Sequence, residues 1–170
     1  NLKQWGLAMQ LHHDARKLLP AGSTGPQANS KPPRQTWVML IWPYIEQNNL
    51  ASQNKLALNF HDPPATIHNT MNGLTGQPVP MYRCPSDPMG VDQTVGQYQR
   101  RRGNYVVNWG IATYPEHGGT VLDTSPAVNG KFAPFSHIDG RRWFPRKTDL
   151  GDVSDGTSNT LMMSEGLVAW

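Results

Sequence analysis

Residues 2 to 19 repeat apolar side chains with the period of an α-helix, but over an unusually wide arc. At steps of about 100° per residue, one narrow polar face holds Lys3, Gln10, His13, Asp14 and Lys17. The remaining sector holds Leu2, Trp5, Leu7, Ala8, Met9, Leu11, Ala15, Leu18 and Leu19. A surface helix of a monomer needs an apolar stripe of only about 100°.

Two explanations of this wide sector remain open. The helix could be a central core helix, covered on all sides by its own domain. Alternatively, its own domain covers one side and neighbouring subunits cover another. In that case the predicted assembly face consists of Leu2, Trp5, Leu7, Met9 and Leu11.

The rest of the chain reads as helices first and strands afterwards. A second helix is predicted from about Gln35 to Asn48, with a kink or break near Ile41 because Pro43 lies inside it. A short helical or irregular connection (Leu50 to Leu58) and a short helix (Ala65 to Met71) follow. The predicted strands are Val79 to Arg83, Asn104 to Asn108, Lys131 to Phe135, Thr148 to Leu150 and Thr160 to Met163.

This order predicts an α+β fold in which the long N-terminal helix packs on a small antiparallel sheet with long loops. A chain of 170 residues fits a single domain, residues 1–170. Within it we distinguish a helix stump (1–19), an α-rich part (35–71) and a part rich in strands and loops (79–170). The 16 Gly and 15 Pro residues agree with many turns.

The charge pattern gives little reason to expect a nucleic-acid partner. The formal net charge is +3, and the only dense basic run is Arg100-Arg101-Arg102. Nucleic-acid binders concentrate such charge on one face, so we interpret this run as a solvated loop.

Spaced acidic residues near the C-terminal end suggest a calcium site or a set of turns. The candidate ligands are Asp149, Asp152, Asp155, Ser158 and Asn159. Carboxylate and amide oxygens around a glycine-containing loop are the ligands that Ca²⁺ prefers. The same side chains also cap the backbone of tight turns. Calcium is the only cofactor that the sequence suggests.

The motifs of common enzymes are missing from the sequence. There is no G-x-S-x-G, H-E-x-x-H, C-x-x-C or phosphate-binding glycine loop. The single cysteine, Cys84, precedes a proline and has no base beside it in sequence. A structural or paired thiol is the better interpretation. We therefore predict no catalytic residues and a protein that is not an enzyme.

Aromatic residues in the second half offer a different kind of site. Trp109, Trp143, Tyr98 and Tyr114 could stack on a glycan or another ligand if they are exposed. The competing explanation is that most of them fill the core between sheet and loops.

Five short segments resemble one large planctomycete family of unknown function that has a prepilin-type N-terminal segment. They are Asn1–Ala8 (NLKQWGLA, similar to NLKQIGLA), residues 43–47 (PYIEQ, similar to PYLEQ), 84–88 (CPSDP), 104–106 (NYV) and 155–161 (DGTSNTL), the last followed by Ser164-Glu165. They occur in the family's order over nearly the whole chain. That family has also been labelled as bacterial solute-binding.

The resemblance implies a type IV pilin or type II pseudopilin-like architecture. Family members carry a cleaved and methylated hydrophobic helix upstream of the first motif, often a Cys just before it, and a segment beyond the last motif. The chain therefore looks truncated at both ends, and the upstream Cys would be the natural partner of Cys84.

The expected function is that of a non-catalytic structural subunit in an extracytoplasmic filament or a type II secretion assembly. It would be anchored in the inner membrane through the upstream helix before assembly, then reside at the cell surface or in the periplasm. Its partners would be copies of itself or other pilin-like subunits. The alternative is a membrane-tethered surface module that binds a glycan or a solute.

Overall fold

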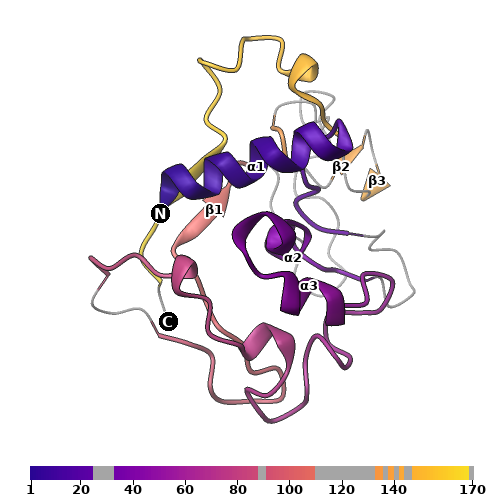
Figure 1. Ribbon diagram of the computed structural model, residues 1–170, viewed down its shortest axis with the longest axis vertical. Helices are drawn as coiled ribbons and strands as arrows, with labels where there is room; N and C mark the ends of the chain where they lie inside the picture. Colours follow the sequence, from indigo (N-terminus) through magenta and orange to yellow (C-terminus); the bar gives the residue numbers. More distant parts are fainter. Residues whose placement is uncertain are drawn as a thin grey trace.

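The protein is described by a computed structural model that covers residues 1–24, 33–87, 91–109, 133–135 and 147–168, together with the backbone of residues 138–139 and 142–143. Helix α1 (Leu2–Arg16) opens the chain and lies across the other elements (Figure 1). It was expected to reach Leu19 but ends at Arg16. Lys17 adopts a left-handed conformation with φ of 58°, and its N–H donates to the carbonyl of His13. A residue in that conformation ends an α-helix.

The predicted second helix is present and is broken where the proline predicts. Helix α2 (Trp37–Ile41) is followed directly by the 3₁₀ helix η1 (Trp42–Ile45), which carries Pro43 in its first turn. A third helix, α3 (Asn48–Gln53), follows after the left-handed residue Glu46.

Two predicted elements between residues 65 and 83 are wrong. Residues 65–71 form turns and irregular structure. The carbonyl of Ala65 accepts from the N–H of Thr75, ten residues later, in place of the N–H four residues later that an α-helix requires. The short 3₁₀ helix η2 (Leu74–Gly76) follows. The segment expected as strand 79–83 holds another 3₁₀ helix, η3 (Pro80–Tyr82). Proline lacks the N–H that a strand ladder needs, and it suits the first helical position.

A small antiparallel sheet packs beside α1. Strand β1 (Tyr105–Val107) pairs with β4 (Met163–Glu165), so that Tyr105 lies opposite Glu165 and Val107 opposite Met163. The strand predicted at 104–108 is thus confirmed, while the last strand lies later than predicted. The described part of the chain has a second strand pair, β2 (Ile138–Asp139) with β3 (Arg142–Trp143). These elements confirm the α+β class.

Two further segments that were predicted as strands differ from the prediction where the structure describes them. Residues 150–152 form the 3₁₀ helix η5 (Leu150–Asp152) in place of a strand at 148–150. Of the strand predicted at 131–135, residues 131 and 132 lie outside the described part of the chain, and Pro134 and Phe135 lie in a turn.

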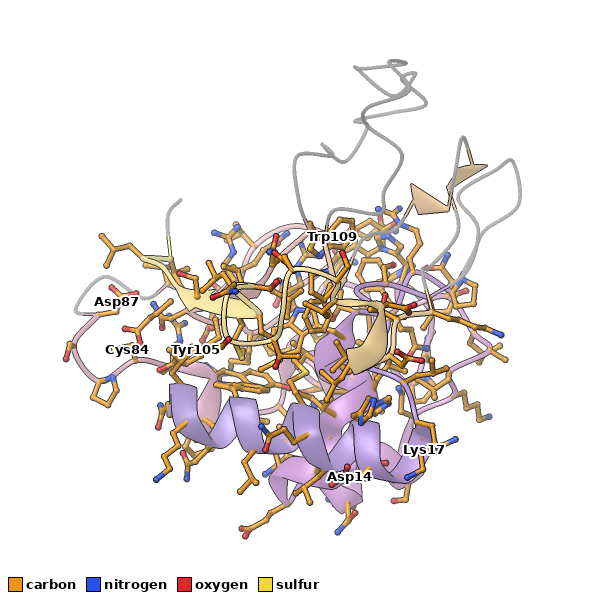
Figure 2. All side chains as sticks on the ribbon, turned by 90° about the horizontal axis from the view of Figure 1, so that it is seen from above. Asp14, Lys17, Cys84, Asp87, Tyr105 and Trp109 are labelled. Carbon is orange, nitrogen blue, oxygen red and sulfur yellow. The ribbon has the colours of Figure 1, made fainter. Side chains whose placement is uncertain are left out.

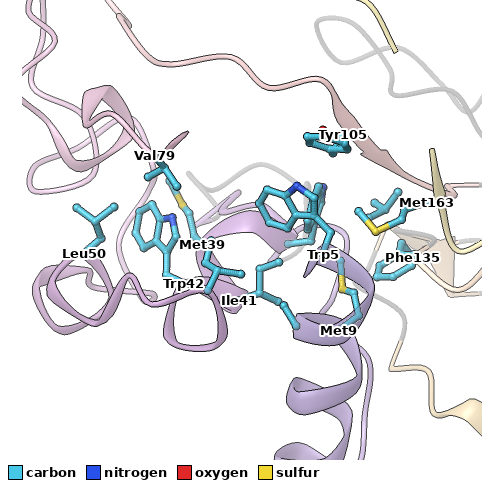
Figure 3. Packing of buried hydrophobic residues seen from close by; sticks show 14 of the residues in the cluster. Trp5, Met9, Met39, Ile41, Trp42, Leu50, Val79, Tyr105, Phe135 and Met163 are labelled. Atoms are coloured by element: carbon cyan, nitrogen blue, oxygen red, sulfur yellow. The ribbon is translucent and has the colours of Figure 1, made fainter. Parts of the chain in front are cut away.

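The core lies between α1, the α2–η1 segment and strands β1 and β4 (Figure 3). Trp5 is its centre and is 1% exposed. Its ring lies 5.1 Å from that of Trp37, 5.8 Å from that of Tyr105 and 6.0 Å from that of Tyr82, measured between centroids. Aromatic pairs at such distances contribute beyond the area that they bury. The first helix is therefore fixed to both the helical part and the sheet.

Candidate functional site

Segments that are far apart in the sequence meet at Asn104, which is 2% exposed. Its side-chain oxygen accepts from the backbone N–H of Cys84 at 2.9 Å. Its amide nitrogen donates to the carbonyl of Gly166 at 3.0 Å and to the carboxylate of Asp87. Three motifs of the sequence, around residues 84–87, 104–106 and 164–166, are thus joined by one side chain. We call Asn104, Cys84, Asp87 and Gly166 the asparagine junction.

The start of α1 is fastened beside this junction. The side chain of Asn1 donates to the carbonyl of Arg83 at 2.7 Å, next to Cys84. Figure 2 shows Cys84, Asp87 and Tyr105 grouped near that end of the helix. The Cys84 thiol is free in this structure and half-buried. The motif residues therefore form a structural joint.

The outer side of α1 bears apolar residues that its own domain leaves uncovered. Leu2, Leu7 and Leu11 are 41%, 56% and 43% exposed. Leu7 and Leu11 are four residues apart and so lie on the same side of the helix. Figure 2 shows Asp14 and Lys17 on the side of α1 that faces away from the core. Leu2, at the start of the helix, lies roughly 140° around the axis from Leu7, on the side of Met9. We therefore call only Leu7 and Leu11 the outer leucines.

The predicted assembly face needs correction at two positions. Trp5 and Met9 are 1% and 0% exposed. They project into the domain's own core, where Trp5 packs on Trp37 and Tyr105. Neither is available to a neighbouring subunit. The wide apolar sector is thus divided between an inner, buried half and the outer leucines.

A cavity of about 450 Å³ opens between the α2–η1 segment and the loops before β1. Its lining is rich in aromatic residues and includes Trp5, Trp37, Trp42, Phe60, Tyr82, Tyr105 and Trp109. Three arginines, Arg34, Arg100 and Arg101, also line it. Two of the aromatic donors are already used, since Trp42 donates to the Tyr82 hydroxyl at 2.5 Å and Trp5 donates to the carbonyl of Met81 at 3.2 Å.

One partly buried carboxylate, that of Asp92, holds arginines at the cationic side of this cavity in place. Asp92 accepts from Arg83 at 2.5 Å, from the guanidinium of Arg101 and from the backbone N–H of Arg102. Burial alone would raise the pKa of Asp92, but these hydrogen bonds outweigh it and lower the pKa below its ordinary value. Asp92 thus stays ionised and fixes Arg101 in place.

Arg100 differs from its neighbours. Its guanidinium lies 6.0 Å from the centroid of the Phe60 ring, and Arg34 lies 5.7 Å from the same ring. Burial and then the charges of Arg102 and Arg34 lower the pKa of Arg100 from its ordinary value. Within the described part of the chain, no carboxylate pairs with Arg100. The interpretation of residues 100–102 as a solvated loop is therefore wrong for this half-buried side chain.

The proposed calcium ligands form turns. Asp149 accepts from the backbone of Asp152 at 2.9 Å, and Asp152 accepts from the backbone of Asp149 at 3.0 Å. Asp155 accepts from the hydroxyl of Thr160 at 2.6 Å, and Asn159 donates to the carbonyl of Asp155 at 2.8 Å. These are the contacts of the capping alternative. Among the described residues, no three acidic, histidine or cysteine side chains form a metal-binding group.

Two of the four predicted stacking aromatics have side chains that the structure describes, and their surroundings differ. Trp109 lines the cavity, whereas Tyr98 packs with His61 and His68, at 4.0 Å and 5.3 Å between ring centroids. Tyr114 and the side chain of Trp143 lie outside the described residues.

The sequence did not reveal Arg34, Arg100 or Trp37 as cavity residues. They come from separate loops and a short helix, with no spacing rule that relates them. The one available signal was the density of arginines at residues 100–102, which we read as solvent-exposed.

A family model described as "Protein of unknown function (DUF1559)" matches residues 1–169. No curated protein and no solved structure matches the chain. Among the residues that the structure describes, the helices are too short or too polar to cross a lipid bilayer.

Proposed function

The chain belongs to this family of unknown function, and from that premise we propose that it is a non-catalytic, pilin- or pseudopilin-like structural subunit of an extracytoplasmic filament or secretion assembly. In this proposal α1 continues a hydrophobic, membrane-anchoring helix, and the described domain is the head. The subunit is anchored in the inner membrane and then assembles with copies of itself or with related subunits.

The observation that carries the proposal is the division of α1 into two apolar sides. The inner side, with Trp5, Ala8 and Met9, is buried in the head. The outer leucines remain exposed although the other side of the same helix forms part of the core. Single exposed leucines are common on monomers, but two on the same side of one helix offer a surface to a neighbour.

The contact that the outer leucines can make is weak for a single pair of subunits but can be repeated in a filament. Covering the remaining surface of each outer leucine would contribute roughly 1 kcal/mol. That sum is weak for a pair of subunits. A head-to-tail interface that does not close repeats along a filament, so each subunit would use the contact twice.

The fastening of α1 agrees with this role. The hydrogen bond from Asn1 to Arg83 and the core contacts of Trp5 hold the start of the helix against the head. If each head is rigidly joined to its helix, the packing of the helices inside a filament also fixes how the heads are arranged on the filament surface.

Cysteine crosslinking of the full-length protein in cells tests the proposal. In a Cys84→Ser background, Leu7→Cys or Leu11→Cys is expected to give disulfide-linked dimers and higher species upon mild oxidation. Val95→Cys is the matched control, since Val95 is 77% exposed and does not belong to α1.

Equal crosslinking at Leu7 and at Val95 would refute the assembly face. Leu7→Lys together with Leu11→Lys gives a second readout. We expect loss of assembled material, with a change in head stability within about 0.5 kcal/mol because both side chains are at the surface.

A further inference from the structure

We propose that the aromatic cavity of the head is a binding site for a small, flat organic anion of the aromatic carboxylate class. Its ring would lie among the aromatic walls and its carboxylate would meet Arg100. This inference goes beyond the assembly proposal and does not depend on it, because the outer leucines take no part in the cavity.

The size and walls of the cavity fit such a molecule. Ligand sites usually enclose about 300–1,000 Å³ and are mainly apolar, with a few polar groups. This cavity encloses about 450 Å³ and is lined by seven aromatic residues. Flat aromatic walls favour a flat ring, because offset and edge contacts add to the gain from burial.

The charge of the cavity selects an anion. Arg34, Arg100 and Arg101 all line it. Asp92 is engaged by Arg101 and Arg83. Arg100 lies among cationic neighbours, since Arg34 and Arg102 both act on it electrostatically. A carboxylate bound there would relieve this repulsion and could accept two hydrogen bonds from the guanidinium.

The indole N–H of Trp37 is a further donor, and it has no acceptor among the residues that the structure describes. Trp37 is 6% exposed and lines the cavity. Its indole N–H makes no hydrogen bond to any described residue, whereas the indole N–H groups of Trp5 and Trp42 both do. Buried tryptophans usually satisfy this group. An oxygen of the bound molecule would supply the acceptor.

Calorimetric titration of the 170-residue chain at neutral pH and low salt tests the proposal with three probes that share one ring system. They are 2-naphthoate (anionic), 2-naphthol (neutral) and 2-naphthylmethylammonium (cationic). We expect saturable binding of 2-naphthoate with one site per chain. The neutral probe should bind at least roughly tenfold more weakly, as expected for loss of a charge-assisted hydrogen bond, and the cation should not bind.

Two variants locate the site. Arg100→Gln should weaken 2-naphthoate binding roughly tenfold and leave 2-naphthol binding unchanged. Trp37→Phe keeps an aromatic wall but removes the N–H donor, and should weaken 2-naphthoate binding by a factor of roughly 5. The matched control is Arg16→Gln, an exposed arginine at the end of α1 that does not line this cavity.

The proposal is overturned by any of three results. One is no binding of 2-naphthoate up to millimolar concentration. Another is equal binding of the anionic and cationic probes. The third is an equal effect of Arg100→Gln and Arg16→Gln. If Arg100→Gln lowers the melting temperature, the comparison of the three probes on the unaltered chain still decides the question.

Discussion

Removing the side chain of Asn104 should cost the head a large part of its stability. In Asn104→Ala the N–H of Cys84, the carbonyl of Gly166 and the carboxylate of Asp87 each lose a hydrogen bond. A typical hydrogen bond contributes about 1 kcal/mol, and one to a charged group about 1.5–3 kcal/mol. The sum is about 3–5 kcal/mol, which is a third or more of the stability of many domains.

Urea denaturation followed by tryptophan fluorescence measures this cost, because Trp5 and Trp37 lie in the core beside β1. The matched control is Asn159→Ala, which removes one exposed hydrogen bond, to the carbonyl of Asp155. We expect the control to cost less than about 1 kcal/mol. If Asn104→Ala costs no more than the control, the asparagine junction is not a structural joint.

Three further predictions concern charge and space. Hydrogen bonds lower the pKa of Asp92 below its ordinary value of 3.8, so the stabilisation by its carboxylate holds above that pH and fades below it. The stability of Asp92→Asn should therefore approach that of the unaltered chain in acid. Burial lowers the pKa of His12 and of His61 below 6.5 in the folded state, so the unfolded state takes up protons first as the pH drops through that value. The urea midpoint of the unaltered chain should therefore fall in this range, and the midpoint of His61→Asn should fall by less. Gly76→Ala should lower the melting temperature because its Cβ would lie 2.0 Å from the carbonyl oxygen of Met71, whereas Gly166→Ala meets no atom within 4 Å and should be nearly neutral.

The elements that the sequence predicts well are those with a strong local signal. Helix α1 has a long periodic pattern, and the break at Ile41 follows from Pro43. Strand β1 has consecutive β-branched and aromatic residues. In contrast, residues 79–83 read as a strand, yet Pro80 begins a 3₁₀ helix there. In that segment the backbone restriction of proline prevailed over the strand-like composition.

The candidate sites depended on tertiary contacts that no local pattern contains. The motif segments could be recognised one by one, but their meeting at Asn104 could not. The helical wheel also could not divide the apolar sector of α1, since burial of Trp5 and exposure of Leu7 depend on which side the sheet covers. For the same reason Arg100 was assigned to solvent, although it lies partly buried beside Phe60.

The asparagine junction also has a consequence for the order of folding. Its hydrogen bonds join residues 17, 20 and 62 positions apart in the chain, and the bond from Asn1 to Arg83 spans 82. Contacts that close long loops form after local helices, because the loop entropy must be overcome first. The junction should therefore close after the rate-limiting step. Asn104→Ala would then hasten unfolding severalfold or more while leaving the refolding rate nearly unchanged. The asparagine junction would thus form late in folding, and its main kinetic effect would be to slow the unfolding of the head.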